Sequence, residues 1–357
     1  MRSYGEIMKV SLFGVDGDFD KNRGESLQRY MYELYINLIR QNIDVIKELP
    51  SVRMPFSRNG LSLLFYDTFK DLSQYDIVHN LDVKPVLPLR RGKAKLVVTV
   101  HDLIPIKHQE FNIDYRRSLR DLMWLWMVTK PGLHLALRAS DYIIAISSQV
   151  REEVIAMGYD KERVFKVNNG VDSRFLKKLP KKVERKRFVV GYLGSFVYRK
   201  NVRFALDAFI KMDAKDAVFS IWGKRGLYTK DLEHKAIENK RILFNGAAKE
   251  SNIVNVYDSF DAFVFPTLYE GFGLPIIEAQ ARGLPVVIYK KGQLPREVRK
   301  CCLEAEDEAH MAQILQDLRD NGYNEKRRKE ATEYARTFTW KNTALETTKV
   351  YKKVSDS

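Results

Sequence analysis

The first half of the chain alternates short apolar runs with segments whose apolar residues recur every three or four positions. The run 8–14 predicts a buried strand, and the loop after it, residues 15–24, is rich in glycine and aspartate. From Ser26, a residue type that favours helix N-caps, helical spacing predicts a helix. The later runs predict strands at 77–78, 96–100, 142–146 and 164–167, with a helix from Ser147 to Met157 that Gly158 ends. This rhythm is typical of a doubly wound α/β domain.

A polar, basic tract at 174–187, around Pro180, interrupts this rhythm. Its composition favours an interdomain linker, and a nucleic-acid or lipid patch is the alternative. The rhythm then restarts, with strands expected at 188–194, 218–222, 241–244, 262–266 and 285–289 and helices at 201–212, 253–260 and 275–282. The pattern therefore predicts two Rossmann-like halves. In such sheets ligands bind at the carboxyl ends of the strands, so a nucleotide could lie between the halves.

Composition narrows the class of protein. The chain has 357 residues, 45% hydrophobic and 30% charged, which suits two soluble domains with sizeable cores. No apolar run approaches the roughly 18 residues of a transmembrane helix, and the first six residues are too polar for a signal peptide. The neighbours Cys301 and Cys302 form no disulfide framework and are expected in a short strand or at its edge. We therefore expect a cytoplasmic protein.

The charge balance is the first indication of a partner. Lys and Arg number 61 against 46 Asp and Glu, a formal net charge of +15. A basic protein favours polyanions, whether phosphates, anionic membrane or nucleic acid. A solvated basic surface is the alternative, so charge alone does not decide the function.

The segment 265–279 carries the most chemistry. A strand is expected to end at Pro266, and a loop with Gly271 and Gly273 brings backbone N–H groups close to a ligand. The helix that starts near Pro275 favours anionic oxygens at its N-terminus. Glu270 and Glu278, eight positions apart, are suited to sugar and ribose hydroxyls. In the alternative interpretation Glu278 is a surface helix residue and the glycines only shape a turn.

This segment resembles the Glu-x7-Glu signature of retaining glycosyltransferases of family 4. The other motifs of that family occur in order along nearly the whole chain: 145–147, 168–172, 191–195, 199–201, 279–287 and 338–340. The resemblance implies the GT-B fold, an α/β architecture of two Rossmann-like domains that face each other across a central cleft. It implies an acceptor-binding domain at 1–172, a linker at 173–187, a nucleotide-sugar-binding domain at 188–340, and a helix at 341–357 that packs back towards the first domain.

The resemblance also implies the reaction and the roles of several residues. Such enzymes move a hexose from a UDP- or GDP-linked donor to a hydroxyl acceptor (a glycan, a lipid or another molecule), without a metal or another cofactor. Arg199 and Lys200 resemble the basic pair that faces the donor diphosphate, where fixed positive charge stabilises the leaving phosphate. Glu278 resembles the ribose-binding glutamate and Glu270 the one near the transferred sugar. The loop from Gly271, with the amides of Phe272, Gly273 and Leu274, is expected beside the sugar and diphosphate.

Further donor contacts are expected elsewhere on the same grounds. His101, at the end of an apolar strand, resembles the family's histidine near the sugar and diphosphate, although the leaving phosphate oxygen is thought to take the acceptor proton. Gly24 and Glu25 resemble the first loop, which touches the diphosphate. The base is expected near Gly223-Lys224 and Asn245-Gly246. Ser195 is a departure, because many relatives have an arginine there.

Other interpretations remain beside this one. Asp16-Gly17-Asp18 mimics the metal motif of another glycosyltransferase fold, but it follows the first strand of a Rossmann-like half, where a loop is expected. The segment 116–127, with Trp124 and Trp126, is either a core helix or an interfacial helix on anionic membrane. A non-catalytic, basic GT-B-like protein that binds nucleic acid or membrane is the alternative function, and a GT-B sugar epimerase fits the motif order less well.

Overall fold

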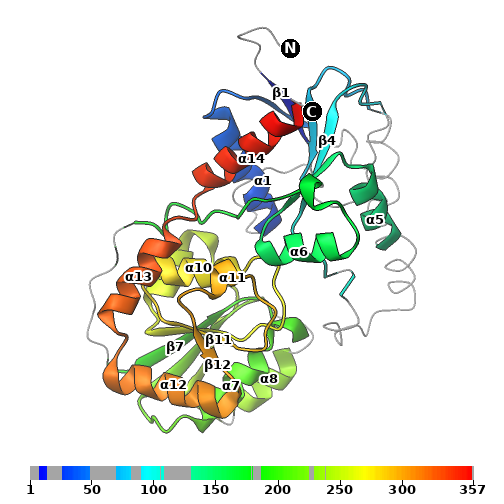
Figure 1. Cartoon of the computed structure of the whole chain (residues 1–357). Helices are drawn as coiled ribbons and strands as arrows, with labels where there is room; N and C mark the ends of the chain where they lie inside the picture. The colour runs from blue at the N-terminus through cyan, green and yellow to red at the C-terminus, as the bar shows by residue number, and fades with distance from the viewer. Residues whose placement is uncertain are drawn as a thin grey trace. The chain divides into compact units, whose positions relative to one another are not determined.

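The computed structural model describes residues 8–13, 26–48, 70–81, 90–104, 106–107, 130–177, 179, 186–224, 229–237 and 239–355. The chain divides into two compact units. The first comprises Met1–Ile106, Arg117–Gly170 and Trp340–Ser357, and the second comprises Lys107–Arg116 and Val171–Thr339. In Figure 1 the described chain runs from the blue strand Lys9–Phe13 to the red helix Trp340–Ser355. Both units contain a parallel sheet with helices, which confirms the prediction of two Rossmann-like halves.

The sheet of the first unit has the strand order β2-β1-β3-β4-β5-β6, and all neighbouring strands are parallel. Most of its residues are buried, as expected for strands covered on both faces. The strands are β1 (Lys9–Phe13), β2 (Asp44–Glu48), β3 (Ile77–Asn80), β4 (Lys95–Val100), β5 (Tyr142–Ala145) and β6 (Val164–Lys166). The strand β2 was not among the expected ones, because its sequence DVIKE holds only two apolar residues, with charged residues on both sides, and forms no longer apolar run.

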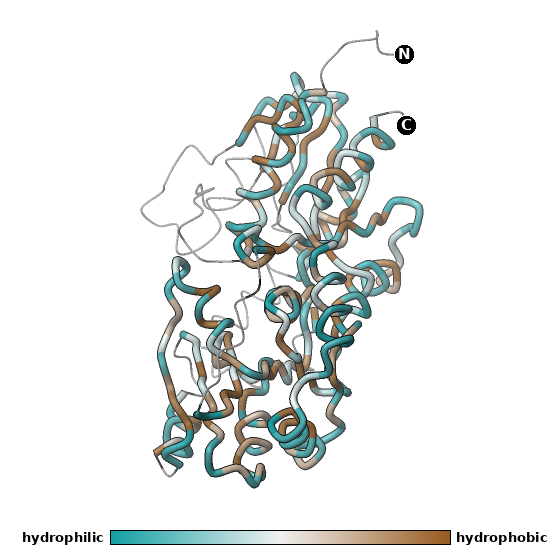
Figure 2. The backbone as a smooth tube through the Cα atoms, turned by 90° about the vertical axis from the view of Figure 1, so that its left-hand side faces the viewer, coloured by the Kyte–Doolittle hydropathy of each residue, from teal (hydrophilic) through white to brown (hydrophobic). Residues whose placement is uncertain are grey.

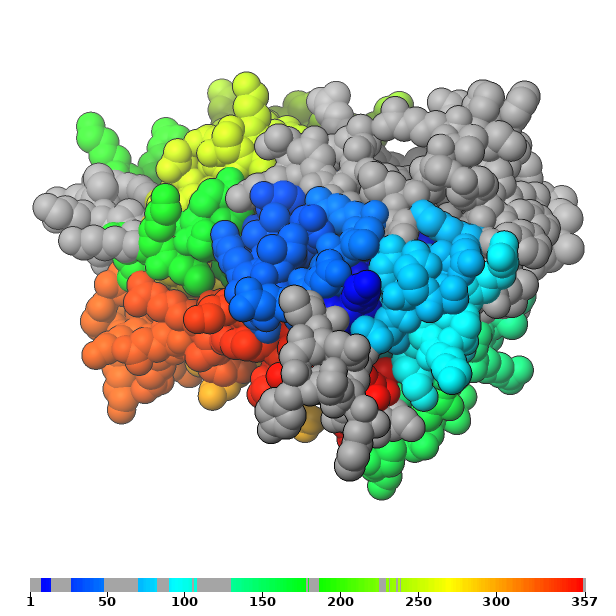
Figure 3. All heavy atoms as spheres, turned by 90° about the horizontal axis from the view of Figure 1, so that it is seen from above, coloured from blue at the N-terminus to red at the C-terminus, as the bar shows by residue number. Residues whose placement is uncertain are grey.

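Two hydrophobic clusters hold helices against this sheet. One cluster joins α1 (Ser26–Ile39) and α14 (Trp340–Ser355), which lie side by side. In Figure 3 the red atoms of α14 border the blue atoms of α1. The other cluster joins α5 (Lys130–Ala139) and α6 (Ser148–Ala156). A one-turn helix, η5 (Lys161–Arg163), precedes β6, and Ser147 caps α6 by accepting a hydrogen bond from the Val150 amide.

A chain of polar side chains crosses the core of this unit. Nδ1 of His79 lies 2.6 Å from the Tyr351 hydroxyl, and Nε2 of His79 lies 2.7 Å from the Thr99 hydroxyl. The Tyr30 hydroxyl lies 3.3 Å from that of Thr99. Burial, followed by the nearby charge of His101, lowers the pKa of His79 to about 3, so this imidazole stays neutral. The contact with Tyr351 fixes the C-terminal helix against the sheet.

The sheet of the second unit has the order β12-β11-β10-β7-β8-β9, again with parallel neighbours. The order reverses between β7 and β10, so this pair forms the topological switch point of the sheet. The strands are β7 (Phe188–Leu193), β8 (Ala217–Trp222), β9 (Ile242–Phe244), β10 (Ala262–Phe265), β11 (Val286–Tyr289) and β12 (Leu303–Ala305). In Figure 2 the coils of the helices carry hydrophilic positions beside hydrophobic ones.

The helices of the second unit follow the strands in alternation. They are η6 (Tyr198–Lys200), α7 (Val202–Lys211), α8 (Thr229–Ile237), η7 (Glu250–Asn252), α9 (Ile253–Asp258), α10 (Leu274–Ala281), α11 (Arg296–Arg299), α12 (Glu308–Asn321) and α13 (Glu325–Ala335). No helix among the described residues is long and apolar enough to span a membrane.

The structure also bears on the expectations for the two cysteines and for the basic tract. Cys302 directly precedes β12, which agrees with the expected position at the edge of a short strand, and Cys301 before it has a left-handed φ of 68°. Residues 171–177, part of the basic tract and the motif before it, pack within the second unit: Arg174 forms ion pairs with Asp172 and Glu250 at 2.9 and 2.6 Å. Residues 178 and 180–185 lie outside the described residues, as does the segment 116–127.

Candidate functional site

Two loops at the switch point of the second sheet bring four polar side chains together. We call Arg199, Lys200, Thr267 and Glu270 the Glu270 cluster. Oε1 of Glu270 lies 2.8 Å from Nη1 of Arg199, 2.6 Å from Nζ of Lys200 and 2.7 Å from the Thr267 hydroxyl. Arg199 and Lys200 follow β7, and Thr267 and Glu270 follow β10. The cluster therefore occupies the place where ligands bind in open parallel sheets.

Backbone contacts hold the two loops of the Glu270 cluster against each other. The Leu268 amide donates to the Arg199 carbonyl at 2.8 Å, and Nη1 of Arg199 donates to the Tyr269 carbonyl at 2.6 Å. Asn201, with a left-handed φ of 51°, ends the short helix η6 and begins α7. Arg199 and Lys200 lie in η6, directly before this turn.

The electrostatics of Glu270 follow from its burial and its partners. Burial raises the pKa of this carboxyl, but the charges of Lys200 and Arg199 and the hydrogen bonds from Lys200 and Thr267 outweigh it and hold the pKa below its ordinary value. Glu270 is therefore ionised near neutral pH. Two fixed cations around one carboxylate leave the cluster with one net positive charge, which suits a phosphate group.

The glycine-containing loop continues from the Glu270 cluster into α10. Gly273 adopts a left-handed φ of 100° directly before the helix, a conformation that glycine permits. Pro275 occupies the first turn of α10, as expected from the sequence. Phe272 is buried and packs edge-on against Phe338, with ring centroids 5.9 Å apart. The loop is thus anchored on one side, and the helix N-terminus lies next to Glu270.

Glu278 lies in α10 and is only 4% exposed, so the interpretation of this residue as a surface glutamate is wrong. Its Oε2 accepts a hydrogen bond of 2.8 Å from the Tyr257 hydroxyl. A buried carboxylate needs such a partner because desolvation without compensation is costly. Glu270 therefore lies in the loop after β10 and Glu278 in the helix α10 that follows this loop, and each carboxylate is buried with hydrogen-bond partners of its own.

The two loops that are expected to contact the nucleobase of the donor lie beside each other. The Gly223 amide donates to the Gly246 carbonyl at 2.8 Å, which joins the loops after β8 and β9. A Cβ at Gly223 would lie 1.9 Å from the Gly194 carbonyl oxygen, so only glycine permits this approach to the loop after β7. The side-chain Nδ2 of Asn245 donates to the Ser220 hydroxyl at 3.0 Å and so points towards β8. Lys224, two residues after β8, is exposed.

His101 belongs to the first unit and follows β4 directly. Its Nε2 lies 2.8 Å from the Leu81 carbonyl oxygen, an arrangement in which the ring donates. The Tyr30 ring packs edge-on against it at 4.7 Å between centroids. The other predicted residues of this unit, Gly24 and Glu25, lie outside the described residues, as do Asp16 and Asp18.

Two residues of the site were not singled out from the sequence. Thr267 stands within the segment 265–279, between Pro266 and Glu270, and a hydroxyl three positions before a key carboxylate is the signal that points to it. Tyr257 offers no such signal, because a tyrosine on a helix among apolar residues is typical of a core position. Only the fold brings Tyr257 to Glu278, 21 positions away.

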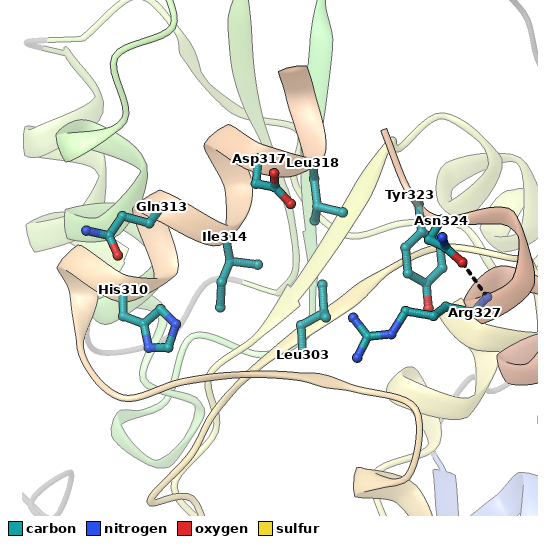
Figure 4. A pocket seen from close by; sticks show the side chains of 9 residues that line it. All are labelled: Leu303, His310, Gln313, Ile314, Asp317, Leu318, Tyr323, Asn324 and Arg327. Carbon is teal, nitrogen blue, oxygen red and sulfur yellow. Dashed lines mark hydrogen bonds between the residues drawn. The ribbon is translucent and has the colours of Figure 1, made fainter. Parts of the chain in front are cut away.

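A separate pocket of about 310 Å³ lies between α12, α13 and β12 (Figure 4). Its apolar lining comes from Leu303, Ile314 and Leu318. The Asn324 side chain also lines the pocket, and it caps α13 by accepting a hydrogen bond from the Arg327 backbone amide. The remaining lining residues are polar or aromatic: His310, Gln313, Asp317, Tyr323 and Arg327. None of the predicted donor-site residues lines this pocket, so it is distinct from the Glu270 cluster.

Two family models match most of the chain. Residues 37–175 match the family model for Glycosyltransferase Family 4, and residues 187–321 match the model for Glycosyl transferases group 1. The O-antigen chain mannosyltransferase B of Escherichia coli is 28% identical over 289 residues, which cover 74% of this chain and 72% of that protein.

Solved structures resemble the whole chain. Sucrose-phosphate synthase from Thermosynechococcus elongatus has a TM-score of 0.72 at 19% identity, over 97% of this chain and 98% of that one. Anabaena HepE, solved in complex with UDP and glucose, has a TM-score of 0.69 at 16% identity, over 97% and 100% of the two chains. At such identities the likeness establishes the fold.

Proposed function

The chain belongs to the glycosyltransferases of family 4, and we propose that it is a retaining hexosyltransferase that works without a metal ion. Its fold is the GT-B fold. The donor in this proposal is a UDP- or GDP-linked hexose, and the acceptor is a hydroxyl group. The observation that carries the proposal is the Glu270 cluster at the switch point of the second sheet, where two fixed cations meet the carboxylate expected near the transferred sugar.

Transfer breaks the bond between the anomeric carbon and a phosphate oxygen, and the electron pair leaves with the nucleoside diphosphate. The acceptor oxygen forms its bond on the same face of the sugar, and its proton passes to the leaving phosphate oxygen. Arg199 and Lys200 stabilise the charge that develops on that oxygen, which is the role a cation would otherwise have. Because both side chains are already held by Glu270 and by the loop backbone, little reorganisation is needed when the charge appears.

The remaining donor contacts follow from the placement of the other residues. We assign Glu278 to the ribose hydroxyls and the amides of Phe272, Gly273 and Leu274 to the sugar and diphosphate at the N-terminus of α10. The joined loops at Gly223-Lys224 and Asn245-Gly246 are assigned to the nucleobase, and His101 is assigned to the sugar and diphosphate. The names of the relatives suggest mannose and glucose as the first donor sugars to test.

A panel of GDP-mannose, UDP-glucose, UDP-galactose and UDP-N-acetylglucosamine tests the proposal by calorimetry and by slow hydrolysis. We expect one nucleotide class to bind and its sugar to be released slowly without an acceptor. The variant Glu278→Ala should weaken binding of the free diphosphate by about 1.5–3 kcal/mol, the value of a hydrogen bond to a charged group. Glu306→Ala, which removes an exposed glutamate paired with Lys290, is the matched control. Absence of binding and hydrolysis across the panel would contradict the proposal.

A further inference from the structure

Glu278 has one neighbour whose position suggests a function beyond packing. The Tyr257 side chain is fully buried at the end of α9, and its hydroxyl donates to Oε2 of Glu278 in α10 at 2.8 Å. Glu278 itself is 4% exposed, so the contact forms away from solvent. In such surroundings a hydrogen bond to a carboxylate is strong and directional.

The ring of Tyr257 is fixed by other aromatic side chains. Phe175 packs edge-on against it at 5.5 Å between centroids, Phe263 lies at 5.3 Å and Phe260 at 6.3 Å. Phe175, Phe260 and Phe263 are all buried. The ring therefore cannot change rotamer without opening a cavity, and the hydroxyl is delivered to one point next to Glu278.

A glycine of the β7 motif takes part in this packing. A Cβ at Gly191 would lie 2.2 Å from the ring of Phe260, so only glycine leaves room for that ring. Phe260 in turn packs against Tyr257. A contact path therefore connects β7, next to the Glu270 cluster, with the hydroxyl that holds Glu278.

We propose that Tyr257 is a positioning residue: its hydroxyl fixes the Glu278 carboxylate in the orientation that recognises the ribose hydroxyls of the donor. This rests on the ribose role assigned to Glu278 above. A carboxylate held at one oxygen loses rotational freedom before the ligand arrives, so it discriminates better between a ribose with both hydroxyls and a sugar lacking one. The Tyr257 hydroxyl should therefore strengthen the preference of the site for ribonucleotides over deoxyribonucleotides.

The test compares UDP and GDP first and uses whichever binds more tightly, together with its 2′-deoxy and 3′-deoxy forms. In Tyr257→Phe, which keeps the ring and removes the hydroxyl, we expect ribonucleotide affinity to fall about tenfold. Affinity for the deoxy form that lacks the contacted hydroxyl should change by less than about twofold. In the Glu278→Ala background, Tyr257→Phe should likewise change ribonucleotide affinity by less than about twofold, because the group it positions is absent.

Tyr351→Phe is the matched control, since it removes another buried hydroxyl that contacts His79 in the first unit. It should lower the thermal unfolding temperature and leave nucleotide affinity unchanged. If Tyr257→Phe weakens the binding of ribonucleotides and deoxyribonucleotides equally, the residue has a packing role only and the proposal is overturned. A Tyr257→Phe variant that does not fold would overturn the proposal as well. If the wild type binds ribo- and deoxyribonucleotides equally, the ribose role of Glu278 fails instead, so the two hypotheses are distinguished.

Discussion

At the scale of the residue, Glu270 determines how the candidate site is charged. One oxygen of its carboxylate meets an arginine, a lysine and a threonine hydroxyl. Glu270 and Thr267 are buried, and the two cations are partly buried. A carboxylate in such a position is ionised only because cations surround it. The same arrangement keeps Arg199 and Lys200 in place before a donor arrives. Preorganisation of this kind is what a leaving diphosphate requires.

Replacement of Lys200 by alanine should reduce donor hydrolysis and transfer by about 100-fold or more, because a preorganised donor to the developing negative charge is lost. Steady-state rates with the donor found in the panel measure this effect. Lys290→Ala is the control, since its ion pair with Glu306 is half exposed and it belongs to no part of the site. A rate for Lys200→Ala within about twofold of wild type would contradict the role of this cation.

His79 predicts a pH dependence of stability. Its pKa is about 3 in the folded protein, against an ordinary value of 6.5. Below pH 6.5 the unfolded chain binds a proton at this residue and the folded chain does not, so the stabilisation is complete above pH 6.5 and is lost as the pH falls towards 3. The free energy of unfolding should therefore fall by about 1.4 kcal/mol per pH unit below 6.5 on account of His79.

Urea unfolding of wild type and His79→Gln at pH 7.5, 6.5 and 5.5 measures this contribution. The variant loses the hydrogen bonds to Tyr351 and Thr99, so it should be less stable at pH 7.5. The difference between the two proteins should shrink as the pH falls. Equal dependence on pH in both proteins would mean that this histidine is protonated in the folded state.

At the scale of the element, α10 connects the glycine loop to the rest of the second unit. Its last turn ends at Arg282, whose guanidinium forms a two-pronged ion pair with Asp258 at 2.7 and 2.9 Å. The same guanidinium donates to the carbonyls of Phe175 and Lys177. The Arg282 side chain therefore fixes the end of α10 to α9 and to the segment that contains Phe175 and Lys177.

Arg282→Ala should destabilise the second unit by about 3–5 kcal/mol, because it leaves Asp258 without its main cation in a largely buried place. Thermal or urea unfolding measures the loss. The matched control is Arg328→Ala, whose partner Glu325 is 76% exposed, and it should cost less than about 1 kcal/mol. Equal losses for the two variants would contradict the structural role of Arg282.

Elements buried on both faces are those that the sequence predicts well. The apolar runs at β1, β4, β5, β7 and β10 each correspond to a strand, because a parallel strand covered by helices has no polar face. The strand β2 has one exposed face, so it forms no apolar run and was not predicted. At the site, the glutamates were found from the pattern of the segment 265–279 and the basic pair from its resemblance to a family motif. The Tyr257–Glu278 contact, in contrast, joins two elements through packing that no local pattern encodes. The contact between His79 and Tyr351, 272 positions apart, is of the same kind.

At the scale of the whole molecule, the second unit uses the reversal of strand order between β7 and β10 to bring the Glu270 cluster together. The first unit has its own reversal, between β1 and β3, with His101 after β4. The proposed chemistry needs cations at the leaving group, and in the second unit protein side chains supply them.

Transfer activity should therefore survive EDTA at concentrations that remove magnesium and manganese. Initial rates with and without chelator, after dialysis of the enzyme and donor, provide the measurement. We expect the two rates to agree. Complete inactivation that magnesium or manganese reverses would overturn the metal-independent mechanism and make Asp16 and Asp18 candidate ligands.

The configuration of the first product tests the central claim most directly. The donors of the panel carry α-linked sugars, and proton NMR within minutes of mixing identifies the anomer that the enzyme releases or transfers before mutarotation. A retaining glycosyltransferase built on the Glu270 cluster yields the α-anomer from an α-linked donor, and Lys200→Ala should slow its appearance. Initial formation of the β-anomer would contradict the account, as would release of sugar at the same rate in wild type and Lys200→Ala.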